Sequence, residues 1–272
     1  NNWFMMYFLS VVLIGTIYPI FLEVLSSQKI SVGPPFYHKL IIPFLIPFLI
    51  AMAIGPKLKW IKSNIEDKVY LILFFLISII LSFLIVKKFN SNVLVNTILV
   101  SSALYLFFIT LRDFFIGKYS NVSQNIAHFG FSLLILSILL NNLFSSEIIT
   151  NLKVGETFTS SKTKIVLKSI NQKKEKNYNS IKANFSIENL NGKIEDFSPE
   201  LRIYNQPNIV TSEADIKTTL LSDKFIVINI VQNQDYFNVR YQVKPFMLWI
   251  WMSVMLISFG GIISFFKKNY EK

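Results

Sequence analysis

The sequence predicts a polytopic α-helical membrane protein with a β-rich domain inserted before its last membrane span. Of the 272 residues, 52% are hydrophobic and 16% are charged, against about 25% charged in soluble domains. Of the 43 charged side chains, 25 fall between Glu147 and Lys244, so the rest of the chain is far more apolar than the average. Six apolar runs can cross about 30 Å of hydrocarbon.

The first two apolar runs each have an alternative to a membrane span. Trp3–Leu22 lacks a basic start and a small-residue cleavage site, which favours a membrane span over a signal peptide. Leu40–Ile54 is only 15 residues long and contains Pro43 and Pro47, so it is either a short kinked span or a re-entrant segment. A span is favoured, because membrane helices tolerate proline and six spans make the loop charges coherent.

The later runs and the loop charges complete the predicted topology. The remaining spans are Val69–Val86, Val93–Leu111, Ile126–Phe144 and Phe246–Phe266. The predicted parts are therefore a membrane domain at 1–144, a polar domain at 145–245, the last span at 246–266 and a tail at 267–272. With six spans, one side receives nine loop Lys and Arg residues and the other four. The positive-inside rule then puts both termini in the cytoplasm and the polar domain on the translocated side.

The polar domain alternates apolar and polar residues, as half-buried strands do. The predicted strands are Lys164–Ile170, Ser180–Leu190, Leu201–Tyr204, Lys224–Gln232 and Tyr236–Val243. Asn191-Gly192 predicts a hairpin turn. A small sandwich or barrel is expected, and its excess of three positive charges is too small to indicate nucleic acid as a partner.

Several chemistries are excluded by residue content. The chain has no cysteine, so disulfides, thiolate metal sites and cysteine nucleophiles are absent. The HExxH, GxSxG and GxxxxGK[ST] motifs of metalloproteases, serine hydrolases and P-loop proteins are also missing.

The two histidines lie in different settings. His128 is about one turn into the fifth span, where an ionisable ring is costly unless it has a partner. It is either a structural hydrogen-bonding group or a metal ligand, because imidazole commonly binds haem iron in helix bundles and the small Gly130 would let a porphyrin approach the helix. The chain has no second intramembrane histidine, so a bis-histidine haem would need its other ligand from elsewhere. His38, at the mouth of the second span, favours a structural or interfacial role.

The remaining polar groups near the membrane have ordinary interpretations. Arg112 and Asp113 end the fourth span, where we expect them to snorkel to the surface. The lysines of the string 55–60, GPKLKW, are expected to hold anionic lipid headgroups, and Trp60 to anchor at the interface.

Several short strings follow one another along the chain in a distinctive order. They contain Gly15, Tyr18 and Pro19, then Ser31, Gly33, Pro34 and Pro35, then Gly55, Pro56 and Trp60, then Ala127-His128-Phe129-Gly130, and finally Lys244-Pro245. This ordered set resembles the C-terminal half of the CcmF/NrfE family of cytochrome c maturation proteins. The similarity extends along nearly the whole chain in the family's order.

The resemblance implies a haem lyase that attaches haem through thioethers to the cysteines of apocytochrome c CXXCH motifs. It implies the haem chaperone CcmE, a CcmH-type subunit, apocytochrome c and quinol as partners. It also implies a permanent b-type haem as an electron relay, with His128 as one axial ligand, Gly130 packing nearby, and the second ligand in the N-terminal half. The other motif positions and the catalytic residues have no assigned role.

The family's tryptophan-rich WWD segment is absent, and the chain begins with Asn1, so we expect half of a longer protein or a split-gene product that is inactive without the N-terminal half. The implied location is the bacterial inner membrane with the β-domain in the periplasm, or the mitochondrial inner membrane if organelle-encoded. The alternative function is export of haem or another small molecule without lyase activity.

Overall fold

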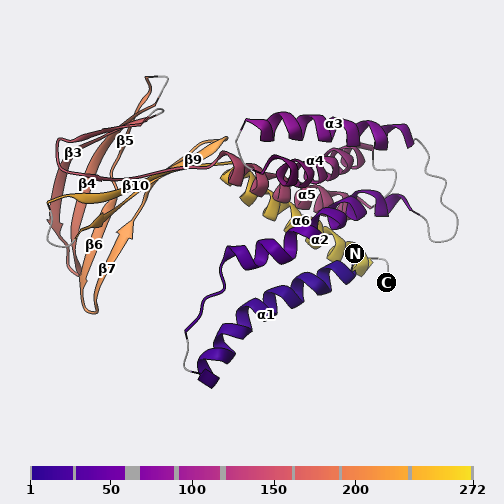
Figure 1. Ribbon diagram of the computed structural model, residues 1–272, viewed down its shortest axis with the longest axis horizontal. Coiled ribbons are helices and arrows are strands. Elements are labelled where there is room, and N and C mark those ends of the chain that lie inside the picture. Colours follow the sequence, from indigo (N-terminus) through magenta and orange to yellow (C-terminus); the bar gives the residue numbers. More distant parts are fainter. Residues whose placement is uncertain are drawn as a thin grey trace. The chain divides into compact units, whose positions relative to one another are not determined.

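The computed structural model describes residues 2–26, 29–58, 68–88, 92–116, 121–160, 163–189, 192–231 and 235–270. The chain forms two compact units. One contains Asn1–Leu139 and Ile250–Lys272, and the other contains Leu140–Trp249. The predicted fold class is confirmed, because six apolar helices and a β-sandwich before the last helix are present (Figure 1).

In the described ranges, six helices are long and apolar enough to cross a membrane. They are α1 (Asn2–Ser26), α2 (Pro34–Ile54), α3 (Lys68–Lys87), α4 (Val93–Ile116), α5 (Val122–Phe144) and α6 (Met247–Tyr270). The second helix begins six residues before the predicted run, because Gly33 precedes it and Pro34 and Pro35 fill its first positions, where a fixed φ suits a helix start. Together with the 3-10 turn η1 (Gly55–Lys57) it gives a candidate span of 24 residues, which is long enough for a full crossing.

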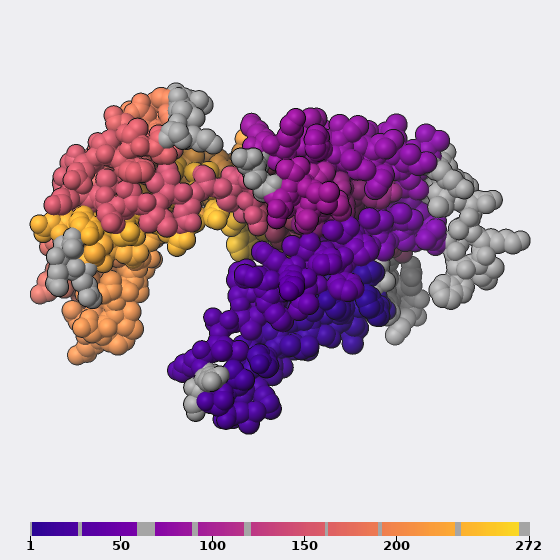
Figure 2. Space-filling model, viewed as in Figure 1, coloured from indigo at the N-terminus to yellow at the C-terminus, as the bar shows by residue number. Residues whose placement is uncertain are grey.

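The helices of the first unit expose most of their apolar surface and bury small contact patches. Helix α1 buries only Val11 and Gly15, and a Cβ on Gly15 would lie 2.6 Å from the Tyr37 hydroxyl oxygen of α2. Helix α4 is the most buried, between α2 and α3. In Figure 2 the indigo side chains of α1 lie on the surface of this unit, as expected for a helix that faces lipid.

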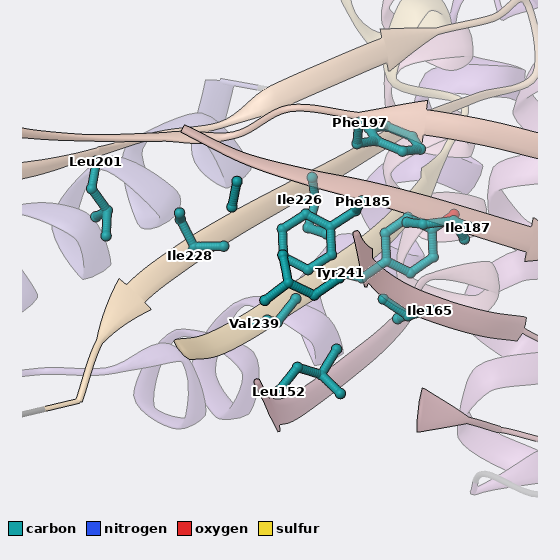
Figure 3. Close-up of a cluster of buried hydrophobic side chains, with 12 residues drawn as sticks. Leu152, Ile165, Phe185, Ile187, Phe197, Leu201, Ile226, Ile228, Val239 and Tyr241 are labelled. Carbon is teal, nitrogen blue, oxygen red and sulfur yellow. The ribbon is translucent and has the colours of Figure 1, made fainter. Parts of the chain in front are cut away.

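The second unit is a sandwich of two antiparallel sheets. The first sheet has the order β1 (Ser146–Leu152), β10 (Phe237–Pro245), β9 (Ser222–Ile230) and β8 (Asp215–Thr218). The second has the order β2 (Thr157–Thr159), β3 (Thr163–Lys174), β4 (Tyr178–Asn189), β6 (Glu200–Asn205) and β7 (Asn208–Glu213), with β5 (Ile194–Phe197) also paired to β4. Their facing side chains form one apolar core around Phe185, Phe197 and Tyr241 (Figure 3).

The five predicted strands correspond to β3, β4, β6, β9 and β10, whereas the other five strands were not predicted. At the predicted β4–β5 hairpin, Gly192 has φ of +69° and its N–H donates to the Asn189 carbonyl at 2.8 Å. A positive φ favours glycine, which explains Gly192. Asn191 lies outside the described residues.

Pairing of β1 with β10 joins the two ends of the inserted domain. Ser146 lies opposite Val243 in this ladder, so the end of α5 meets the start of α6. The Asn141 side-chain amide donates to the Pro245 carbonyl at 2.5 Å, and the rings of Phe144 and Phe246 are 6.3 Å apart between centroids.

Candidate functional site

A buried ion pair lies between the ends of α2 and α4. The Lys57 Nζ atom is 2.5 Å from Oδ2 of Asp113, and the two side chains are 1% and 12% exposed. Removing two charges from water is costly, and close pairing offsets that cost only when the geometry is good. The pairing is close here, whereas the second Asp113 carboxylate oxygen has no hydrogen-bond partner among the described residues.

Local sequence explains why Lys57 turns into the helices. Gly55-Pro56 ends α2 in a 3-10 turn, closed by the Leu58 N–H, which donates to the Gly55 carbonyl at 3.1 Å. This tighter turn carries the chain out of the helix, and the lysine side chain stays buried.

Arg112 is a second cation beside the same carboxylate. Its Nη1 atom is 3.9 Å from Asp113 Oδ1, and its guanidinium lies 3.7 Å from the centroid of the Tyr70 ring. A cation over an aromatic face is attracted by the ring quadrupole. Among the described residues, the cluster therefore holds two cations against one carboxylate.

Helix α5 presents a polar face to these groups. Asn125, His128 and Ser132 are spaced three and four residues apart, which puts them on one side of a helix. The Asn125 amide donates to the backbone carbonyl of Asp113 at 3.2 Å, and the Ser132 and Thr110 hydroxyl oxygens are 2.7 Å apart. These two contacts fix how α5 lies against α4.

His128 lies between these contacts and lines a cavity of about 10 Å³ together with Asp113, Asn125 and Pro56. This volume accommodates about one water molecule. The Asp113 Oδ1 atom is buried without a hydrogen-bond partner in the described part of the chain, so a water in this cavity has a carboxylate oxygen available to it.

The donor chemistry of His128 fits a haem ligand. The imidazole is half-buried and makes no hydrogen bond within the described ranges, so its nitrogens remain available. The cavity beside it is far too small for a porphyrin, so a haem would have to lie outside that cavity. In the described residues no cluster of three or more His, Asp or Glu side chains is placed to hold a metal ion.

Gly130 faces another neighbour. Two residues along a helix turn it by roughly 200°, so Gly130 lies opposite His128. A Cβ there would lie 3.0 Å from the backbone nitrogen of Ile257 in α6. Gly130 therefore allows close packing of α5 and α6, and its expected place near a haem stays a prediction.

The same contact is repeated from the α6 side. A Cβ on Gly260 would lie 2.8 Å from both the Ala127 nitrogen and the Ser123 carbonyl oxygen. Two glycines, one on each helix, thus let the backbones approach, as small residues do between membrane helices.

Most of the other motif positions lie at element boundaries. Ser31 is exposed ahead of α2, Tyr18 is 51% exposed on α1, and Pro19 is inside that helix. Lys244 and Pro245 end β10 at the junction with α6. Trp60 lies outside the described residues. His38 is exposed near the start of α2, in agreement with an interfacial position.

Two sequence interpretations are corrected here. Lys57 does not reach lipid headgroups and Asp113 does not snorkel to the surface, because they neutralise each other inside the helices. The available signal was a lysine and an aspartate at the ends of two spans predicted to lie on the same side.

The fold and the site define a class: a multi-helix membrane protein with an extramembrane β-sandwich and one histidine beside a buried charge cluster. A family model described as the CcmF C-terminal beta-sandwich matches residues 143–245. The predicted resemblance to the C-terminal half of CcmF is confirmed, since curated relatives also match along the whole chain.

The CcmF protein of Pseudomonas fluorescens is 25% identical over 288 aligned residues, which cover 100% of this chain and 43% of the relative. The CcmF protein of Escherichia coli K12 is 24% identical over 282 residues, with 100% and 43% coverage. A solved structure named cytochrome c heme lyase CcmF aligns with a TM-score of 0.72 at 18% identity, covering 96% of this chain and 44% of the other, which shows a common fold. The chain therefore spans less than half the length of these relatives.

Proposed function

We propose that this chain forms the C-terminal part of a cytochrome c haem lyase and that His128 supplies one axial ligand to a b-type haem. The observation that carries the proposal is the match to CcmF proteins along the whole chain. His128 adds support, since its ring makes no hydrogen bond among the described residues. The second ligand would come from the N-terminal part of the protein.

The polar groups around His128 would hold it in place. Asn125 and Ser132 tie α5 to α4 on either side of it, and the Lys57–Asp113 pair ties α2 to α4. A b-type haem bound there would supply one-electron transfer. Cations such as Arg112 beside the site would favour the more electron-rich state of a redox group nearby.

The finer steps belong to the same proposal. Haem would come from the chaperone CcmE and be joined to apocytochrome c thiols with a CcmH-type partner, while quinol supplies electrons to the b-type haem. The absence of cysteine in this chain suits a protein that handles free thiols, because it offers none for mixed disulfides. The β-domain would face the bacterial periplasm, or the mitochondrial intermembrane space if the protein is organelle-encoded.

Coexpression with the N-terminal part in membranes tests the proposal. The purified pair should show a low-spin b-type haem spectrum, and His128→Ala should abolish it. The matched control is His38→Ala, which removes the chain's other histidine and should leave the spectrum unchanged. An unchanged spectrum in His128→Ala would overturn the ligand assignment.

Covalent attachment is tested with the same pair in the presence of haem-loaded CcmE, the CcmH-type subunit and a reduced CXXCH apocytochrome. The expected product is haem that stays with the cytochrome after denaturation. Movement of haem across vesicles without apocytochrome, and no attachment, would favour the exporter function instead.

A further inference from the structure

The turn between β8 and β9 exposes two adjacent large apolar side chains. Leu220 is 69% exposed and Leu221 is 68% exposed. Ser222 at the start of β9 lies opposite Pro245, the last residue of β10. The turn therefore extends past the end of β10, to the level at which α6 begins.

Hydrogen bonds hold this turn against the first residues of the helix. The Trp249 indole N–H donates to the Leu220 carbonyl at 2.9 Å, and the Phe246 backbone N–H donates to the Leu221 carbonyl at 2.9 Å. The Thr219 N–H donates to the Ser222 carbonyl at 3.0 Å. Both leucine carbonyls are satisfied within the protein, so the turn can enter a medium poor in water without leaving them unpaired.

The surroundings of the turn have the composition of a membrane interface. Phe246, whose backbone bonds the turn, packs its ring on Phe144 at the α5–α6 junction, and Trp249 lies in the first turn of a helix apolar enough to span a membrane. Aromatic rings gather at the headgroup level of bilayers. Lys217 and Lys244, on the strands that lead to this junction, have charges that complement anionic lipid phosphates.

We propose that the β8–β9 turn inserts Leu220 and Leu221 into the interfacial layer of the bilayer, beside the start of α6. The partner is the lipid bilayer itself. Exposed apolar side chains rimmed by polar residues mark such contact surfaces. The β-domain would thereby be docked on the membrane at a third point besides its two helical connections. This proposal uses α6 as a membrane span and does not depend on haem binding.

The absence of native cysteine permits a direct depth measurement. Single substitutions Leu220→Cys, Leu221→Cys and Val154→Cys are introduced into this 272-residue chain and labelled with a nitroxide. Val154 is the matched control, because it is an apolar turn residue that is 55% exposed beyond the opposite end of β1. The strand separates the two ends by roughly 20 Å.

The labelled proteins are reconstituted in vesicles of phosphatidylethanolamine and phosphatidylglycerol, and collision rates with oxygen and with a water-soluble nickel chelate are measured. Labels at 220 and 221 should give an oxygen-to-nickel ratio several-fold above that of the label at 154. Equal ratios at all three sites would overturn the proposal. Shielding of labels 220 and 221 from both reagents would also overturn it, since that result indicates a covering protein surface.

Discussion

The helical unit and the β-sandwich place apolar and polar side chains in opposite ways. In α3, Leu84 is 62% exposed whereas Ser78 and Ser82 are fully buried. In the sandwich, Phe185 and Ile228 are buried, and most of the lysines lie on the outside. The difference shows that the two units are built for different solvents, lipid around the helices and water around most of the sandwich.

One ion pair from each unit shows what the surroundings of a pair change. Lys57 and Asp113 are 1% and 12% exposed, whereas Lys168 and Asp196 in the sandwich are 52% and 69% exposed at a similar distance of 2.8 Å. An exposed pair contributes little because water and salt screen it. Loss of one partner from a buried pair leaves an uncompensated charge. The location of a pair, rather than its length, should therefore decide its effect.

The largest effect is expected from breaking the buried pair. Asp113→Ala should lower the free energy of unfolding by about 3–5 kcal/mol, because Lys57 stays buried without its counter-ion. Denaturant unfolding in detergent micelles measures this. Asp196→Ala is the control in the sandwich and should change little. Replacing both partners, with Lys57→Met and Asp113→Leu, should recover most of the loss, and equal losses from Asp113→Ala and Asp196→Ala would contradict the comparison.

A smaller effect should distinguish helix packing from lipid exposure within α6. Gly260→Ala should destabilise the helical unit by about 1–3 kcal/mol, because the new methyl group would meet backbone atoms of α5 at 2.8 Å. The adjacent Gly261→Ala is the matched control, since a Cβ at Gly261 meets no described atom within 4 Å. Thermal unfolding in the same detergent should therefore shift only for Gly260→Ala. Equal shifts would mean that helix propensity, not packing, decides.

Sequence reasoning predicted what repeats along the chain and missed what depends on distant contacts. Each of the six apolar runs and five alternating strands can be identified from its own residues, and the described part of the structure contains a corresponding helix or strand for each. β1 and β8 lie at the two edges of one sheet and carry little pattern of their own, because a strand at an edge is defined by its partner. The pairing of β1 with β10, in which Ser146 lies opposite Val243, is such a contact between distant parts of the chain.

The candidate site also contains one residue that its local sequence identifies and a pair that depends on distant contacts. His128 was identifiable because a histidine inside an apolar run is costly by itself. Lys57 and Asp113 lie 56 residues apart in sequence, and each has an ordinary explanation at the end of its own helix. Gly130 lies two residues from His128, and the rotation between them points it at α6, a contact that the sequence by itself does not show.

The smallest expected effect concerns Glu195 and its lysine partners in the sandwich, whose contribution to the unfolding free energy should depend on pH. Burial alone would raise the pKa of the Glu195 carboxyl, but hydrogen bonds and charge from Lys224 and Lys193 outweigh it and hold that pKa below its ordinary value of 4.5. A lowered pKa stabilises the fold fully above the unfolded pKa, and this contribution is lost as the pH falls through the folded pKa. Glu195→Gln should lower the free energy of unfolding by about 1 kcal/mol at pH 7, and by less as the pH falls from 5 to 3.

Lys224→Met tests the same pair from the other side, because Lys224 Nζ contacts both carboxylate oxygens at 2.8 and 2.9 Å. The difference in unfolding free energy between this variant and the wild type should also shrink as the pH falls from 5 to 3. Denaturant unfolding followed by circular dichroism at several pH values measures both variants, and a cost that stays constant down to pH 3 would show that the charge of Glu195 contributes nothing to the sandwich.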